Sequence, residues 1–403
     1  MEQAIVSSHL EKLELNALLE VTQAINNNLP EDDLYKIYKF TLLADFNVKK
    51  LALYVLDNQW QCKVNFGVGH DFCKNHLPHH FADLTTPTKL TTKDNDFSKF
   101  DFVIPVLHKT RLLALVFVGD LKSNIDRKNL SSETTFLEAL TNIVLVAIEN
   151  KKLAKQQLEQ EAYKKEMEIA SQVQQYLFPD KLPSTDKLAM AATYLPHRDV
   201  GGDYYDHLPI DDDKCIICIA DVSGKGVPAA LMMSNFQASL HTLVRKTVDL
   251  KEIVEDLNLQ IKFSGNGEIF ITFFIAMYDA KEKMLNYINC GHNPPIVRFH
   301  DGSTVLLDQG TTVLGMFSPL PFNSMGTLSG ASNFTLFCYT DGLSESNNLK
   351  DEEFGSERIE KIVAELTNQN PKELNSAMMK AVNEFRQEVD FRDDVTLLTC
   401  RML

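Results

Sequence analysis

The sequence lacks any long apolar run. The longest, Leu112 to Val118, has the length of a strand and not the roughly 20 residues that a helix needs to cross a bilayer. The N-terminus has no basic start followed by an apolar core, which argues against a secretory signal. The seven cysteines are scattered and odd in number, so we expect reduced thiols and not a disulfide scaffold. These absences predict a cytoplasmic protein without a membrane span.

An excess of positive charge is also missing. The formal net charge of the 403 residues is −15, which argues against a nucleic-acid-binding surface, because such a surface carries a basic stripe. Residues 201–403 hold 29 acidic and 17 basic residues, whereas residues 1–150 hold 19 and 15. An acidic half can be only a solubilising surface, or it can contain carboxylates that a divalent cation neutralises. Composition does not choose between these two interpretations.

Glycine and proline are absent between Asp126 and Pro179. Within this interval, the run from Glu149 to Leu177 is rich in helix formers, and its apolar residues are mostly three, four or seven positions apart. The pattern predicts a helical coiled-coil linker over residues 151–180, with a homodimer formed through residues 149–177. The spacing contains a stutter, which perturbs the regular seam. The alternative is one long helix that packs on its own domains.

The segments on either side of this linker differ in pattern. Residues 8–150 show amphipathic helical spacing followed by strand-like apolar runs, which indicates an α/β domain. Residues 185–403 are rich in short strands with interspersed helices. The expected fold class is therefore α+β, with two domains joined by a helix.

Aspartates stand at four predicted strand ends or tight turns in the second domain. Asp203 follows two glycines, Asp221 ends an apolar strand before a glycine-rich turn, and Asp341 precedes a glycine. Asp393 and Asp394 stand before the last predicted strand. A single aspartate of this kind is usually a turn former or a helix cap. Four in one acidic domain suggest charge compensation by Mg²⁺ or Mn²⁺, and two such ions can activate water and clamp a phosphoryl group.

Five segments in the second domain resemble one protein family. They resemble the bacterial stage II sporulation protein E and RsbU branch of the metal-dependent (PPM, PP2C-like) serine/threonine phosphatases. The segments are VGGDYYD (200–206), ADVSGKGVPAALMM (220–233), NCGHNPP (289–295), YTDGLSES (339–346) and DDVTLL (393–398). The resemblance implies a PP2C-like α-β-β-α sandwich over residues 185–403, with two Mn²⁺ or Mg²⁺ ions at one end.

The resemblance also implies roles for individual residues. Asp221 would bridge the two ions, the carbonyl of Val222 would serve one of them, and Asp341 and Asp393 would complete the other. Asp203 would hold metal-bound water, which hydrolyses phosphoserine or phosphothreonine in this family. These four aspartates are thus the expected catalytic residues, and together with Val222 they are the expected metal ligands.

Other residues of the segments receive weaker interpretations. Asp394 stands where members of the wider superfamily carry asparagine, so we expect it to support the metal ligands without binding an ion itself. His292 is expected to order its loop. The histidine that follows the aspartate and glycine in animal-type members is replaced here, in Asp221-Val222-Ser223, so the general acid is unassigned. Arg198 is the nearest candidate for a phosphate-binding arginine, although an exposed surface arginine is the plainer interpretation.

Residues 8–150 resemble a GAF sensor domain in pattern. The resemblance rests on the opening helix LNALLEVTQAINNNL, the strand pair FVIPVLHKTRLLALVFVG and the ending AIENKKL (147–153). It implies a pocket for a small ligand or partner whose identity the sequence does not give. A PAS domain is the structural alternative.

The combined hypothesis is an Mn²⁺- or Mg²⁺-dependent protein phosphatase that an N-terminal sensor regulates. By resemblance, its substrate would be a phosphorylated anti-sigma-factor antagonist, a STAS-domain protein, in a bacterial partner-switching pathway. One alternative is a degenerate phosphatase that binds a partner without hydrolysis. Another is a constitutive phosphatase with a vestigial sensor.

Overall fold

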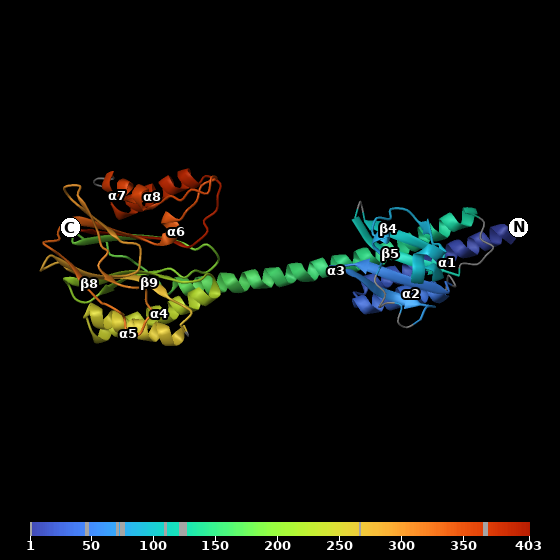
Figure 1. Cartoon of the computed structure of the whole chain (residues 1–403), viewed down its shortest axis with the longest axis horizontal. Helices are drawn as coiled ribbons and strands as arrows, with labels where there is room; N and C mark the ends of the chain where they lie inside the picture. Colours follow the sequence, from blue (N-terminus) through green and yellow to red (C-terminus); the bar gives the residue numbers. More distant parts are fainter. Residues whose placement is uncertain are drawn as a thin grey trace. The chain divides into compact units, whose positions relative to one another are not determined.

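The structure is a computed structural model that describes residues 2–403 except 45–47, 70–71, 73–76, 109–110, 121–126, 266 and 366–369. The chain divides into two compact units, Met1–Glu161 and Ala162–Leu403 (Figure 1). Helix α3 (Arg127–Gln175) contributes residues to both. This one continuous helix includes most of the expected linker, residues 151–180, and begins well before it, which agrees with the lack of glycine and proline in this interval.

The first unit is built on an antiparallel five-stranded sheet with the order β2-β1-β5-β4-β3. One face packs against helices α1, α2 and the first part of α3, where the hydroxyls of Tyr38 and Thr141 are 2.7 Å apart. The other face is covered by aromatic rings, including Phe72, Phe97 and Phe117. The bounds are α1 (Glu2–Asn26), α2 (Glu31–Ala44), β1 (Lys50–Leu56), β2 (Trp60–Phe66), β3 (Thr88–Lys89), β4 (Phe102–His108) and β5 (Arg111–Gly119), with short 3₁₀ helices η2 (His79–Phe81) and η3 (Thr92–Lys99).

The second unit contains two sheets. The first has the order β13-β10-β9-β8-β7, with β14 also paired to β10, and the second has the order β12-β11-β15-β16-β6. The strands are β6 (Leu188–Leu195), β7 (Tyr204–Pro209), β8 (Lys214–Val222), β9 (Ile271–Asp279), β10 (Met284–Cys290), β11 (Ile296–Phe299), β12 (Thr304–Leu306), β13 (Gly310–Thr311), β14 (Gly326–Ser329), β15 (Phe334–Tyr339) and β16 (Val395–Met402).

Helices cover the outer face of each sheet. Helices α4 (Val227–Lys246) and α5 (Leu250–Ser264) pack on the first sheet, and α7 (Ser356–Glu365) and α8 (Pro371–Arg386) pack on the second (Figure 1). The short helix α6 (Asp341–Ser344) follows β15 directly. The core between the sheets joins residues such as Ile217 and Phe274 to Leu336 and Leu398. The expected α+β class, with an α-β-β-α sandwich at the C-terminus, is confirmed.

Strand β8 shows how the alternation of side chains builds these layers. Ile216 and Cys218 face the helices, whereas Cys215 and Ile217 face the second sheet. The Cys215-x-x-Cys218 spacing therefore places the two thiols on opposite faces, and both are buried and free. Cys62 in β2 is disulfide-bonded, so the expectation of reduced thiols throughout is wrong for this residue.

No helix among the described residues combines the length and the apolar character required to cross a membrane.

Candidate metal centre

One end of the sandwich gathers the four predicted aspartates from both sheets. Asp221 lies at the end of β8, where it pairs with Thr272 of β9 in the first sheet. Asp341 follows β15 and Asp393 precedes β16, and these two strands are neighbours in the second sheet. Asp203 stands just before β7. The backbone thus brings to one place residues that are up to 190 positions apart in the sequence.

Asp203 is held by two threonine hydroxyls. Its side chain is 1% exposed, and its Oδ2 accepts hydrogen bonds from Oγ1 of Thr340 at 2.8 Å and Oγ1 of Thr396 at 2.5 Å. Burial, and then the charge of Asp221, raises the pKa of Asp203 above its usual range.

Asp221 is the centre of the electrostatic cluster. Burial, and then the charges of Asp341 and Asp393, raise its pKa to about 7. The pKa of Asp341 is itself raised by burial and then by Asp393. The pKa of Glu345 is raised by burial and by Asp341. The site therefore concentrates negative charge that its neighbours do not fully compensate.

Lys225 supplies the positive charge closest to Asp393. Its Nζ lies 2.6 Å from Oδ2 of Asp393 and donates a hydrogen bond to the carbonyl of Arg392 at 2.5 Å. Lys225 belongs to the glycine-rich turn after Asp221, so it links the turn of the first sheet to the loop of the second. Sequence reasoning noted the Gly-Lys-Gly triplet but not this contact.

Asp394 lies near the cluster and anchors a loop. Its Oδ1 accepts a hydrogen bond from the backbone N–H of His197, and its Oδ2 accepts one from Gly202, both at 2.7 Å. Both carboxylate oxygens are thus occupied by the loop that leads to Asp203. This placement agrees with the expectation that Asp394 stands behind the ligands.

The donor chemistry of the site fits a hard divalent cation. Asp203 is buried, Asp221, Asp341 and Asp393 are half-buried, and carboxylate oxygens are the ligands that Mg²⁺ and Mn²⁺ prefer. Within the described part of the chain, no three His, Cys, Asp or Glu side chains stand close enough together to hold an ion. Lys225 neutralises part of this charge through its ion pair with Asp393. A divalent ion would neutralise more of it.

Three further residues of the expected site have clear positions. The carbonyl oxygen of Val222 lies against Gly202, 2.8 Å from where a Cβ would stand. The ring of His292 is buried, with Nδ1 2.9 Å from Oγ1 of Thr272, and burial lowers its pKa to about 4. His292 therefore orders the end of β10 as a neutral residue. Arg198 is exposed beside Gly226.

The threonines and Lys225 are the contacts that sequence reasoning missed. Thr340 and Thr396 each lie within two residues of an aspartate in a family segment, and this proximity was the available signal.

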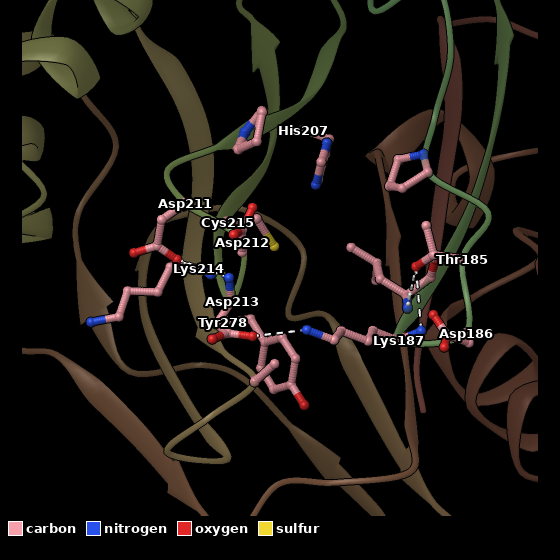
Figure 2. A pocket seen from close by; sticks show the side chains of 14 residues that line it. Thr185, Asp186, Lys187, His207, Asp211, Asp212, Asp213, Lys214, Cys215 and Tyr278 are labelled. Carbon is pink, nitrogen blue, oxygen red and sulfur yellow. Dashed lines mark hydrogen bonds and ion pairs between the residues drawn. The ribbon is translucent and has the colours of Figure 1, made fainter.

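A cavity of about 270 Å³ lies at the other end of β8, away from these aspartates. It is lined by residues of the β7–β8 turn and of the start of β6, and Figure 2 shows the ion pair between Lys187 and Asp213 beside it, at 2.9 Å. None of the expected site residues lines it.

The turn before Asp203 leaves no room for a side chain at Gly201. A Cβ there would stand 2.3 Å from Oδ2 of Asp394 and 2.5 Å from the hydroxyl of Tyr194. Gly201→Ala is therefore expected to lower the free energy of unfolding by about 1–3 kcal/mol, because overpacking forces the turn to shift. Scanning calorimetry would measure it, with Gly69→Ala as the control, since no atom lies within 4 Å of that position. An unchanged unfolding transition in Gly201→Ala would contradict the packing described.

Comparison with known protein families identifies the second unit. A family model described as stage II sporulation protein E (SpoIIE) matches residues 211–403. Residues 211–403, just under half of the chain, are thus similar to the SpoIIE-type, PP2C-like phosphatase domains. The match covers Asp221, Asp341 and Asp393, whereas Asp203 lies before it. The SiaA-PP2C domain of Pseudomonas aeruginosa has the same fold as the phosphatase domain, with a TM-score of 0.55 and 21% identity over 61% of this chain and 99% of that one.

Two curated relatives extend the comparison beyond the phosphatase domain. The protein IcfG of Synechocystis sp. is 25% identical over 324 residues, which cover 73% of this chain and 50% of IcfG. The phosphoserine phosphatase RsbU of Bacillus subtilis is 28% identical over 247 residues, which cover 60% of this chain and 71% of RsbU. The chain thus spans about half the length of IcfG.

Proposed function

We propose that this protein is a metal-dependent phosphatase that hydrolyses phosphoserine or phosphothreonine in a protein substrate. The observation that carries the proposal is the carboxylate cluster of one buried and three half-buried aspartates, to which both sheets contribute and whose residues lie in the segments of the phosphatase family. Two Mn²⁺ or Mg²⁺ ions would be held by the carbonyl of Val222 and by Asp203, Asp221, Asp341 and Asp393. When bound, such ions supply Lewis acidity and lower the pKa of water.

The chain's own residues position the reacting groups. Asp221 projects from the first sheet, and Asp341 and Asp393 project from the second, so the sandwich fixes their separation. Thr340 and Thr396 orient the carboxylate of Asp203. A hollow of about 360 Å³ beside Asp393, lined by Lys225, Gly342 and Arg392 among others, gives a phosphoryl group access to the cluster. Arg198, at the glycine-rich turn, is the candidate for contacting that group.

A non-catalytic binding module is the alternative function. A degenerate phosphatase would be marked by loss of a ligand, and each of the four aspartates is retained. Retention of a costly buried charge cluster favours hydrolysis over simple binding.

The proposed substrate is a STAS-domain protein phosphorylated on serine or threonine, in a cytoplasmic partner-switching pathway. The support is the similarity to RsbU, which is named a phosphoserine phosphatase. The test is release of inorganic phosphate from such a phosphoprotein in the presence of Mn²⁺, with a phosphotyrosine peptide as the control. Faster release from the phosphotyrosine peptide would contradict the proposal.

We further propose that the first unit is a GAF-type sensor and that two chains pair through residues 149–177. The support for pairing is a stripe of apolar side chains that α3 leaves exposed. Leu158, Ile169 and Val173 are 66%, 61% and 57% exposed, and their spacing places them along one side of the helix. A second copy would bury this stripe.

Charged substitutions in this stripe are expected to separate the chains. Leu158→Glu and Val173→Glu would place like charges opposite each other across the seam, so light scattering should report a shift from dimer to monomer mass and the phosphatase rate should change. Gln160→Glu, an exposed position on the opposite side of the helix, is the control. A wild-type protein that is already monomeric, with both variants matching its rate, would refute the pairing.

A further inference from the structure

The last turn of α3 makes a direct contact with the turn that leads to Asp203. Nε2 of Gln174 donates a hydrogen bond to the carbonyl of Gly201 at 2.7 Å, and the N–H of Gly201 donates one to Oε1 of Gln174 at 3.2 Å. One side-chain amide thus pairs with both backbone groups of one residue. Gln174 is 6% exposed, whereas its neighbours Val173 and Gln175 are exposed.

The orientation of the helix determines this contact. Successive residues of an α-helix point about 100° apart, so only one face of the last turns of α3 meets the phosphatase domain. Met167, Ala170 and Gln174 lie on that face and are half-buried or buried. Just beyond the helix, the ring of Phe178 lies 4.9 Å from that of Tyr194, between centroids, and fixes the end of α3. The exposed stripe with Val173 lies on a neighbouring face.

The turn that Gln174 holds is part of the site. Gly202 is bonded to Asp394 through its N–H and lies against the carbonyl of Val222, so the turn touches the loop before β16 and the end of β8. Asp203 is the next residue. Gly201 and Gly202 lack side chains that could brace the turn, so its position depends on Gln174, Asp394 and the backbone around Val222.

We propose that Gln174 is a positioning residue through which helix α3 sets the placement of the Gly201–Asp203 turn and, with it, the affinity of the site for metal ions. The inference rests on the proposed function and adds the regulatory contact of that same site. A rotation of α3 by one residue would carry the amide about 100° away from Gly201 and bring Val173 or Gln175 toward it. Val173 has no amide, so both hydrogen bonds would be lost in the rotation that brings it toward Gly201. The contact is made at the turn that precedes Asp203.

The test compares Gln174 with its exposed neighbour in the full-length chain. Gln174→Met keeps the side-chain length and removes both hydrogen bonds, and Gln174→Glu sets a carboxylate oxygen against the carbonyl of Gly201. Gln175→Met and Gln175→Glu are the matched controls. Calorimetry would measure the affinity for Mn²⁺ alone, a phosphate-release assay would measure the Mn²⁺ concentration for half-maximal rate, and a melting curve in chelator would confirm folding.

Both Gln174 variants are expected to bind Mn²⁺ about tenfold more weakly and to need correspondingly more Mn²⁺ for half-maximal rate. Losses of this size are typical when a residue that positions metal ligands, without binding the metal itself, is replaced. The Gln175 variants should match wild type. A purely structural role would lower the melting temperature of the Gln174 variants but leave their Mn²⁺ affinity at the wild-type value, and that result would overturn the inference. A wild-type protein that binds Mn²⁺ without releasing phosphate would refute the proposed function, and calorimetry of the variants would still decide the role of Gln174. A wild-type protein that binds no Mn²⁺ would overturn both.

Discussion

Asp221→Asn is expected to reduce Mn²⁺-supported phosphate release by about a thousandfold or more. Asp221 is half-buried, and the charges of Asp341 and Asp393 act on its carboxylate, so it is the residue that would contact both ions. Bound ions contribute several kcal/mol to stabilising a phosphoryl-transfer transition state, and about 4 kcal/mol corresponds to this factor in rate. Asparagine keeps the size of the side chain and removes its charge, so the change tests the charge itself.

The control is Asp212→Asn, an exposed acid in the turn before β8 that removes the same charge away from the cluster. Phosphate release and Mn²⁺ affinity should both stay at the wild-type level in this variant. Near-wild-type turnover in Asp221→Asn would end the two-metal account.

The stability of the metal-free protein is expected to fall as pH rises from about 4 to about 7. In the folded state the pKa of Asp221 is raised to about 7, whereas in the unfolded chain it has its ordinary value near 4. Between these values the folded state keeps a proton that the unfolded state has released. Because the folded state binds more protons in this window, the free energy of unfolding decreases with pH and levels off above about 7.

Bound Mn²⁺ replaces that proton, so the stabilisation by metal should grow through the same window. Melting temperatures at pH 5.5 and 7.5, with chelator and with Mn²⁺, would measure both effects. Asp221→Asn lacks the titrating carboxyl, so the pH dependence of its metal-free melting should be weaker than that of wild type. An identical pH dependence in the two proteins, together with no shift on adding Mn²⁺, would count against a buried carboxylate cluster.

The sequence predicted many strands in the second unit because their residues alternate in polarity or are continuously apolar, whereas the layered sandwich followed from the family resemblance. Sequence patterns did not predict β7, which directly follows Asp203. In this strand, Tyr204 and Asp206 are buried, and Asp206 is hydrogen-bonded to Tyr204 and to Nε2 of His241 in α4 at 2.7 Å. A hydrophobicity pattern assigns an aspartate to the surface. The cost of burying Asp206 is compensated by its hydrogen bonds, one of which comes from His241, 35 positions away in the sequence.

The continuity of α3 was missed for a different reason. The residues around 150 change in composition, which favoured a boundary there, but helix propensity does not change and no glycine or proline intervenes. The helix therefore continues from one unit into the other.

The convergence of the four aspartates could be predicted from the family resemblance. The groups that orient the site could not be predicted from it. The hydroxyl of Thr396 reaches Asp203 across 193 positions of sequence, and the amide of Gln174 reaches Gly201 from a helix whose neighbouring residues are exposed. Such contacts depend on how the sheets and the end of α3 pack, which local pattern does not encode.

The central claim is that the carboxylate cluster holds the ions with which this chain hydrolyses phosphoserine or phosphothreonine. The most direct measurement is phosphate release from a phosphoserine STAS-domain protein by full-length protein, first stripped with chelator and then titrated with Mn²⁺. The account predicts no turnover in the stripped protein, recovery on adding Mn²⁺, weaker recovery with Mg²⁺, and no recovery in Asp221→Asn. Turnover that persists in the stripped protein, or that Asp221→Asn retains, would contradict it.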